Sequence, residues 1–551
     1  MYVGRKVIFM KSKPILPTLK MIIPLILAIV IMIPRLSSAQ FGLLDDFLML
    51  DNVRNLMQGN WSMSHDLQAG RFRPVYWLYF TLIYGVAGPS PFWFFFAQLI
   101  LLLSLLFEIR ALMKMANAKD WQILITSLVF LFSMPIIENF YTLSKGEPPQ
   151  LVFLLASLLC FEKTKSLQKP SAKTLFAFLS FFCILFAMLV KETALIMVPI
   201  VGLWFGFVLF FQKKDPTQKR SDYVLFLAAA TLAVLAYFGL RAVWGTASIS
   251  GGTYTQRYDL TLQAIVSRIL RWLTMYAFYF HYLLPLAVLT MIAIFSNAIE
   301  EHKQQMFNWI AWVLLWMVVL LPWEFAEVYY LLPISFGFAM LIGFLLPSVK
   351  TLITSKKPLV RWVSILLLGL TLVLLLATLP NFITHGRMQL TLDRVNAMML
   401  EGTVEIVPQN GELYNGLDSQ NEYERNIQGY FQGMGERNDI SYYFIDEEVF
   451  ENFSHASGGI VILPLVQNQP TLTVRSGMEE RYNMERRRVI FEKSEDRLSY
   501  LLEFSDRFQI LNINLPVLLC PLLDQAGYCE FPDPLFDTHM FSYSWEVYQI
   551  K

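Results

Sequence analysis

Eleven stretches of the sequence are apolar for long enough to cross a lipid bilayer, and this feature limits the fold more than any other. About 20 residues of α-helix span the roughly 30 Å of bilayer hydrocarbon. Only 16% of the residues are charged and the mean hydropathy is +0.47, which excludes an ordinary soluble globule. We therefore expect an α-helical polytopic membrane protein. Its predicted spans lie near residues 19–35, 91–110, 121–138, 147–161, 174–190, 193–211, 223–243, 272–297, 308–322, 330–349 and 361–380.

Lysine and arginine predict the orientation. The N-terminal segment carries Arg5, Lys6, Lys11, Lys13 and Lys20 without an acid, and alternate later loops repeat this bias. By the positive-inside rule the N-terminus and these loops are cytoplasmic, and an odd number of spans places residues 381–551 outside. We expect the plasma membrane of a prokaryote. The basic start and the "SSAQ" after the first stretch also fit a cleavable signal peptide, which would leave Asp45 outside as well.

A further apolar stretch, residues 75–87 ("VYWLYFTLIYGVA"), is too short to span the bilayer. It is rich in aromatic residues, follows Arg71 and Arg73, and ends before two prolines. These features are typical of a helix that lies in the membrane interface. We therefore predict an interfacial helix in the first outer loop.

After Pro380 the composition changes, because the apolar runs shorten to strand length and charged residues return. We predict two units, a transmembrane module over 1–380 and an extracytoplasmic α/β domain over 381–551. The predicted strands are "GTVEIVP", "ISYYFID", "GGIVILPLV", "FQILNINL" and "SYSWEVYQIK", and the predicted helix is "NEYERNIQGYFQGMG". Cys520 and Cys529 fit either a disulfide or two buried thiols.

Ionisable residues gather in the predicted outer loops, whereas the middles of the spans are almost bare. His281 is the main exception, and we interpret it as a core histidine bonded to a neighbouring helix. An ion-coupled carrier would place such groups at the bilayer midplane. The loop residues are Asp45, Asp46, Asp51, Asp66, Arg54, Arg71, Arg73, Lys145, Glu147, Lys191, Glu192, Arg257, Glu324 and Glu327.

The adjacent acids Asp45 and Asp46 in "FGLLDDFLML" follow the first span directly. A carboxylate at the outer face can take a proton from an attacking hydroxyl, while a nearby cation neutralises a departing lipid phosphate. A lone aspartate is a weak base, and a second carboxylate or partial burial raises its pKa. The alternative is that the pair caps a short helix, "DDFLMLDNVRNLMQG". One acid can cap while the other reacts.

Two short motifs add candidate substrate-binding residues. Lys145 and Glu147 in "SKGEPP" fit contacts to an acceptor or a phosphate, or else a solvated loop pair. Lys191 and Glu192 in "VKET" lie in a very short connection between two spans. They fit either substrate binding or an ion pair that anchors the turn.

Three further residues are weaker candidates. Arg71 and Arg73 fit binding of a lipid phosphate, or else snorkelling to the interface. Glu327 in "WEFAEVYYLLP" is a candidate for sugar contact, and we interpret Tyr329 and Tyr330 beside it as part of an interfacial aromatic belt.

The order of these motifs resembles the GT-C glycosyltransferase superfamily. The acidic pair is followed by "GRFRPVYWLYFTLIYG", "SPFWFFFAQLILLL", "SKGEPPQLVFLLASLL" and "LVKETALIMVPI", as in protein O-mannosyltransferases and the bacterial lipid A aminoarabinose transferase. The resemblance covers roughly residues 20–380 and is strongest over 40–200. It implies an inverting sugar transfer from a polyprenyl-phosphate donor on the outer face, with Asp45 as the base. The second acid is Asp46 here, where relatives often have glutamate, so the role of Asp46 is less defined.

We therefore predict a glycosyltransferase that acts on a polyprenyl-phosphate-linked sugar, with membrane lipids around it and a protein, lipid or glycan as acceptor. The alternatives are a transporter or flippase of lipid-linked saccharides, which needs a polar path through the bundle, and a non-catalytic scaffold. A net charge of +1 without a basic, aromatic-rich stripe excludes nucleic acid as a partner. No metal-ligand cluster is evident, although Asp45 and Asp46 could hold a divalent cation through oxygen ligands.

Overall fold

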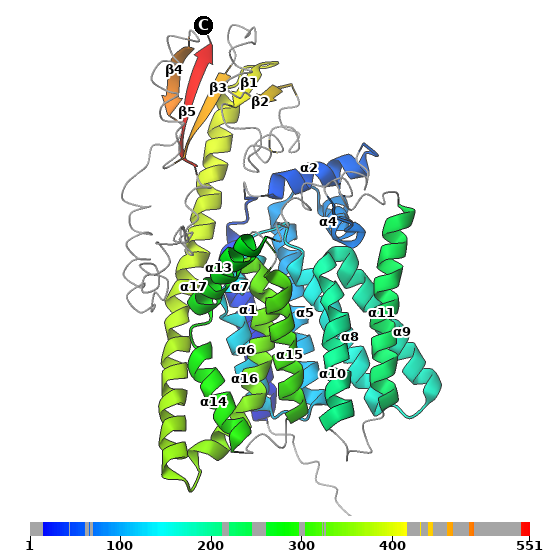
Figure 1. Cartoon of the computed structure of the whole chain (residues 1–551). Helices are drawn as coiled ribbons and strands as arrows, with labels where there is room; N and C mark the ends of the chain where they lie inside the picture. The colour runs from blue at the N-terminus through cyan, green and yellow to red at the C-terminus, as the bar shows by residue number, and fades with distance from the viewer. Residues whose placement is uncertain are drawn as a thin grey trace, which may run out of the picture.

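The chain was analysed as a computed structural model, and its described residues form a helical bundle with a small sheet beyond one end (Figure 1). The long helices run side by side, and the C-terminus lies at the sheet (Figure 1). The structure describes residues 15–42, 45–60, 66, 70–211, 220–244, 261–296, 303–321, 323, 327–415, 430, 439–444, 460–466, 484–489 and 542–550.

The described residues of the predicted spans are mainly helical, but short turns at 132–133 and 280–282 divide the spans predicted over 121–138 and 272–297, so the number of eleven stays a prediction. By length and composition alone, six helices of the described residues are suited to cross a membrane, or up to seven if one bent pair counts as a span. The bundle consists of α1 (Ile15–Ser37), α5 (Pro91–Met115), α6 (Asp120–Leu131), α7 (Met134–Tyr141), α8 (Glu147–Ser166), α9 (Pro170–Val190), α10 (Met197–Phe211), α11 (Arg220–Val243), α13 (Leu262–Tyr279), α14 (Leu283–Phe295), α15 (Lys303–Leu320), α16 (Leu332–Ile353) and α17 (Pro358–Ile406).

Several spans are interrupted near one end of the bundle. Helices α6 and α7 meet at a bend of 62°, where Ser133 and Pro135 interrupt the helical hydrogen bonding. Short 3-10 helices precede α10 and α16, namely η1 (Glu192–Ile196) and η3 (Val328–Leu331). These breaks bring polar backbone and charged side chains to the end of an otherwise apolar bundle.

Helix α16 lies at the centre of the bundle, since 83% of the apolar window in Val328–Ile353 is buried. Two glycines allow this close packing. A Cβ on Gly343 would lie 2.0 Å from Thr126 Oγ1, and one on Gly337 would lie 2.7 Å from the Trp312 ring. The Gln122 amide of α6 also donates to the Gly343 carbonyl at 3.0 Å. Small residues at contacts are the usual means by which membrane helices approach one another.

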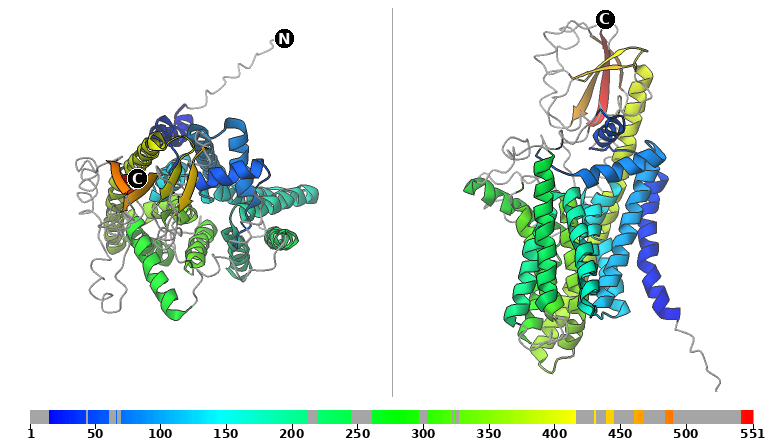
Figure 2. Two further views of the ribbon diagram at one scale, coloured as in Figure 1. Left: turned by 90° about the horizontal axis from the view of Figure 1, so that it is seen from above. Right: turned by 90° about the vertical axis from the view of Figure 1, so that its right-hand side faces the viewer.

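Two short helices cover one end of the bundle, α2 (Asp46–Met57) and α4 (Pro74–Ala87). Helix α4 lies across the ends of the long helices (Figure 2, right). It begins at a proline, buries Tyr76, Trp77 and Phe80, and leaves Leu82 60% and Val86 89% exposed. This confirms a short helix over residues 75–87, and its place in the membrane interface stays a prediction.

Helix α17 extends from the bundle to the sheet (Figure 1), and it crosses the predicted domain boundary at Pro380. The strand predicted over "GTVEIVP" is wrong, because residues up to Ile406 are helical. The β-branched residues of that segment alternate with polar ones, as in a strand. They nevertheless extend a helix that is already formed, and adding a residue to a helix costs less than starting a new element.

The described strands β1 to β5 are Glu412–Asn415, Ser441–Phe444, Ile460–Val466, Met484–Val489 and Ser542–Ile550. They form one five-stranded mixed sheet in the order β2-β1-β3-β5-β4. Strand β1 pairs in parallel with β2 and β3, whereas β5 is antiparallel to β3 and β4. Strands β2, β3 and β5 confirm three predictions, and β1 and β4 were not predicted. The predicted strand "FQILNINL", most of the predicted helix "NEYERNIQGYFQGMG", and both Cys520 and Cys529 lie outside the described residues.

Candidate active site

Residues far apart in the sequence meet at the end of the bundle that lies under α2 (Figure 1). The turn before α2, the α7–α8 loop, the α9–η1 junction and the start of η3 all contribute charged or aromatic side chains. The described residues of this cluster are Asp45, Lys145, Glu147, Lys191, Tyr329 and Tyr330.

Asp45 stands at the start of α2 in a left-handed conformation, with φ of 68°. Aspartate and asparagine tolerate this region better than other residues with a side chain. The Asp45 side chain makes no capping hydrogen bond, so capping does not account for it. Instead its Oδ2 lies 3.8 Å from Lys145 Nζ, and the side chain is 37% exposed. Asp45 is thus a carboxylate that both faces a cation and can be reached from outside the protein.

Lys145 is nearly buried and is held from several sides. Its Nζ lies over the Tyr329 ring, 4.3 Å from the centroid. The loop that carries it is fixed by Tyr76 of α4, whose hydroxyl donates to the Ser144 carbonyl at 2.8 Å. Burial lowers the pKa of Lys145, whereas the negative charges of Asp45 and of more distant carboxylates raise it. The effect of the carboxylates is the larger, so the pKa of Lys145 lies above its usual value. Lys145 is therefore a cation at neutral pH.

Glu147 and Lys191 form a direct ion pair between the start of α8 and the end of α9. The Lys191 Nζ also lies over the Tyr330 ring, 4.2 Å from the centroid. The Gln150 side chain donates to the Lys191 carbonyl at 2.7 Å, which fixes the backbone of this turn. The structure thus joins the two motifs "SKGEPP" and "VKET" that the sequence analysis selected separately.

Tyr329 and Tyr330 form an aromatic surface beneath the two lysines, with ring centroids 4.2 Å apart. The sequence analysis assigned both to an interfacial belt, and this interpretation is wrong for Tyr330, which is 8% exposed and packs inside the protein. A tyrosine beside two lysines binds them through its π-face, so these contacts hold the cations in place. A sequence alone does not show which cations a tyrosine will meet.

Arg73 has a structural partner, because it binds Asp66 through two hydrogen bonds of 2.8 and 3.3 Å. Its guanidinium also lies 4.7 Å from the Tyr76 ring centroid. This arrangement does not fit snorkelling. Arg71 lies nearby and is coupled electrostatically to Glu192 and Tyr330, so it belongs to the Lys191 side of the cluster.

Asp46 has a different environment from Asp45. It is 2% exposed, and its Oδ2 accepts a hydrogen bond of 2.8 Å from the Gly42 amide. Burial raises the pKa of Asp46 to about 8, and the charge that reinforces this shift belongs to Asp393 of α17. The expected pairing of Asp45 with Asp46 is therefore replaced by two carboxylates that have different partners.

The remaining candidates are less informative. Glu327 precedes η3 and acts electrostatically on Lys145 from a distance. The half-buried His281 donates a hydrogen bond of 3.0 Å from Nε2 to the Leu374 carbonyl of α17, which confirms that it bonds to a neighbouring helix. Arg257 and Glu324 lie outside the described residues. Within the part of the chain that the structure describes, no three His, Cys, Asp or Glu side chains come together as a metal site.

The sequence analysis missed two side-chain pairs at this end of the bundle, a hydrogen-bonded glutamate and histidine and a buried ion pair of arginine and aspartate. Glu138 of α7 contacts His385 of α17 at 2.7 Å, and Arg35 of α1 contacts Asp393 of α17 at 2.7 Å. Both α17 residues come after the predicted boundary at Pro380. The available signal was the continuing helical periodicity of "FITHGRMQLTLDRV", which places the two residues near one face.

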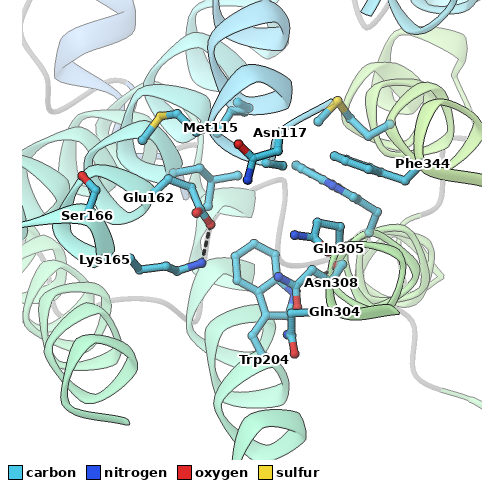
Figure 3. A pocket seen from close by; sticks show the side chains of 15 residues that line it. Met115, Asn117, Glu162, Lys165, Ser166, Trp204, Gln304, Gln305, Asn308 and Phe344 are labelled. Carbon is cyan, nitrogen blue, oxygen red and sulfur yellow. Dashed lines mark hydrogen bonds and ion pairs between the residues drawn. The ribbon is translucent and has the colours of Figure 1, made fainter. Parts of the chain in front are cut away.

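A cavity of about 350 Å³ lies at the opposite end of the bundle (Figure 3). Helix α8 shows this placement, because Glu147 at its start belongs to the charged cluster while Ser166 at its end lines the cavity. None of the residues predicted for catalysis or substrate binding lines it. Its polar lining residues include Asn117, Glu162, Lys165, Gln304, Gln305 and Asn308.

Comparison with known proteins gives similarity in structure only. No family model matches the chain, and no curated protein matches its sequence. ArnT from Cupriavidus metallidurans bound to undecaprenyl phosphate is 12% identical, with a TM-score of 0.50 over 84% of this chain and 95% of ArnT. The apo state of the same protein is 11% identical, with a TM-score of 0.48 over 85% of this chain and 96% of ArnT. The oligosaccharyltransferase from Archaeoglobus fulgidus, tethered with an acceptor peptide, is 9% identical, with a TM-score of 0.44 over 78% of this chain and 64% of that protein. The chain therefore shares the fold of ArnT.

Proposed function

We propose that this chain, whose fold is that of the GT-C superfamily as its sequence motifs predict, is an integral-membrane glycosyltransferase. It moves a sugar from a polyprenyl-phosphate donor to an acceptor hydroxyl. The observation that carries the proposal is the pairing of the accessible Asp45 with Lys145 at one end of the bundle. The likeness to ArnT, which was crystallised with undecaprenyl phosphate, supports the class of donor.

In the proposed reaction Asp45 acts as the general base. Its carboxylate takes the proton of the acceptor hydroxyl while that oxygen attacks the anomeric carbon of the donor. The bond between the anomeric carbon and the phosphate oxygen breaks, and its electron pair leaves with the lipid phosphate. Attack from the face opposite the leaving group inverts the anomeric configuration. No covalent intermediate with the protein is required.

The cations beside Asp45 suit the departing phosphate. Lys145 and Lys191 are both held over tyrosine rings, so their ammonium groups are positioned before substrate binds. Arg71 adds positive charge on the Lys191 side. Glu147 keeps Lys191 in place when the phosphate is absent, and Glu192 and Glu327 are candidates for contacts to the sugar.

We assign the reaction to the outer face of the membrane. The Lys- and Arg-rich segments support a cytoplasmic N-terminus, and the predicted odd number of spans supports an outer location for the charged cluster and the sheet. Membrane lipids surround the bundle, and the acceptor is a protein, lipid or glycan at that surface. Asp45 and Asp46 have different partners, so a divalent cation is not assigned to them.

A flippase of lipid-linked saccharides is the alternative. It would require polar groups along a path through the bundle. Helix α16, the most buried of the described helices long enough to span, has no ionisable side chain from Leu332 to Val349. This observation favours the transferase.

Purified protein in proteoliposomes separates the two functions. A polyprenyl-phosphate donor with a labelled sugar is supplied, and free or acceptor-linked sugar and lipid phosphate are measured. We expect release of lipid phosphate with inversion at the anomeric carbon, seen by NMR. Movement of intact donor across the membrane without release of lipid phosphate would instead identify a flippase.

A further inference from the structure

We propose that Arg35, Asp46 and Asp393 form a buried positioning cluster that fixes the Asp45 segment against α17, with Asp46 as its uncharged member. The proposal rests on the proposed function, because it assigns Asp46 a positioning role in that reaction rather than a reacting one. It also makes Asp393, which lies about 350 residues further along the chain, part of the support of the catalytic loop.

Arg35 connects three parts of the chain. Its Nη2 lies 2.7 Å from Asp393 Oδ2, and the two side chains are 1% and 3% exposed. The same Nη2 donates to the Gln40 carbonyl at 3.0 Å, in the linker that leads to α2. The guanidinium also stacks on Phe95 of α5, 3.8 Å from the ring centroid. Arg35 thus fixes the end of α1, the linker and α17 relative to one another.

Gly42 connects the two acids. Its amide donates to Asp46 Oδ2 at 2.8 Å. A Cβ on Gly42 would lie 3.0 Å from Asp393 Oδ1 and 3.4 Å from Asp46 Oδ2, so both carboxylates approach the same backbone atom. The bare backbone of glycine lets Asp46 of α2 and Asp393 of α17 pack against one short stretch of the linker.

The charges of the cluster balance if Asp46 keeps its proton. Arg35 is paired with Asp393, and Lys145, the other cation that acts on Asp46, contacts Asp45. A second buried carboxylate without a cation of its own would be costly. Burial and the charge of Asp393 raise the pKa of Asp46 to about 8, consistent with a neutral acid at pH 7. Two acids near one guanidinium then share one proton.

The cluster determines the conformation of Asp45. Gly42 and Asp46 are anchored on either side of the short segment that carries Asp45. The left-handed φ of 68° at Asp45 is unfavourable for a residue with a side chain and persists only when its surroundings enforce it. The anchors supply that constraint, so the reacting carboxylate is held facing Lys145.

The test compares variants of the full-length protein in lipid nanodiscs. Asn is the neutral isostere of a protonated aspartate, so Asp46→Asn should keep most of the turnover of the wild type. Asp46→Ala, which loses the Gly42 hydrogen bond, should lower kcat by about 10- to 100-fold with little change in donor KM, because small displacements of a reacting group cost this much. Asp393→Asn should behave like Asp46→Ala, and Asp51→Asn on the same helix is the matched control.

A second measurement does not depend on activity. Unfolded Asp46 titrates near 3.8 and folded Asp46 near 8, so the folded protein holds an extra proton between these values. The contribution of Asp46 to stability is complete below about pH 4 and is lost as the pH rises to about 8. Thermal stability of the wild type should therefore fall more steeply over this window than that of Asp46→Asn.

Two results would overturn the proposal. One is a folded Asp46→Asn variant as inactive as Asp45→Asn, which would make Asp46 a reacting group. The other is an equal pH dependence of stability in the wild type and Asp46→Asn. If the wild type transferred no sugar from any donor, the proposed function would fail, and the stability comparison would still decide the charge state of the cluster.

Discussion

Asp45 and Asp46 are adjacent in the sequence but have separate environments. Asp45 is partly exposed and lies 3.8 Å from a lysine, whereas Asp46 is buried against a backbone amide. Asp45 precedes the first turn of α2 with a positive φ, so the two side chains leave the backbone in different directions. In the proposed mechanism the exposed carboxylate takes the proton and the buried one holds the loop.

Lys145 gives a prediction at the same scale. Lys145→Met keeps the length of the side chain but removes the ammonium group beside Asp45. We expect weaker donor binding and at least a tenfold loss of kcat/KM, about 1.4 kcal/mol or more, because the cation is nearly buried. Donor titration and steady-state kinetics measure this.

Lys173→Met is the matched control for Lys145→Met. The Nζ of Lys173 lies 2.5 Å from Asp222 Oδ1, away from the charged cluster around Asp45. Its replacement should leave kcat/KM unchanged. Equal losses in both variants would show that Lys145 acts through stability and not through the substrate.

The sequence identified Asp45, Lys145, Glu147 and Lys191 because charged residues between apolar spans are conspicuous. It did not identify Asp393, because an acid in a helix beyond a predicted domain boundary looks like an ordinary surface residue. Which residues pair depends on how the helices pack. That information lies in contacts across hundreds of residues and is absent from any local pattern.

Among the elements, helix identity was predictable and helix interruption was not. Long apolar runs determine where helices form, since the backbone has no other partner in hydrocarbon. The bend between α6 and α7 and the 3-10 turns η1 and η3 lie within or beside continuous apolar runs, so the apolar pattern does not show them. Helix α17 was predicted to end near Pro380, but one proline removes a single backbone hydrogen bond and the helix continues to Ile406.

Close packing of α16 predicts the effect of a single methyl group. Gly343→Ala places a Cβ 2.0 Å from Thr126 Oγ1 and should destabilise the protein by about 1–3 kcal/mol. Gly239→Ala in α11 meets nothing within 4 Å and should be neutral or slightly stabilising, because alanine favours helix. Thermal unfolding of the two purified variants measures the difference. A Gly343→Ala protein as stable as Gly239→Ala would contradict the close contact between Gly343 of α16 and Thr126 of α6.

At the scale of the whole molecule, the charged cluster lies at one end of the bundle together with α2, α4 and the sheet (Figures 1 and 2). Helix α17 connects this end to the opposite one and also carries Asp393. An acceptor that binds near the sheet would thus lie near the helix that contacts the segment before α2.

The orientation of the whole molecule can be tested by thiol labelling. In a background without the four native cysteines, Asn60→Cys after α2 and Lys356→Cys before α17 place thiols at opposite ends of the bundle. We expect a membrane-impermeant maleimide to label Asn60→Cys in intact cells and Lys356→Cys only after permeabilisation. The reverse pattern would place the cluster on the cytoplasmic side.

The central claim is that Asp45 is the general base, and the turnover of Asp45→Asn tests it most directly. Asparagine tolerates the left-handed conformation and keeps the shape of the side chain, so folding should be preserved. We predict donor binding close to that of the wild type and a loss of about 10²- to 10⁴-fold in kcat for sugar transfer from a labelled polyprenyl-phosphate donor. A folded Asp45→Asn protein with near-normal kcat would contradict the account.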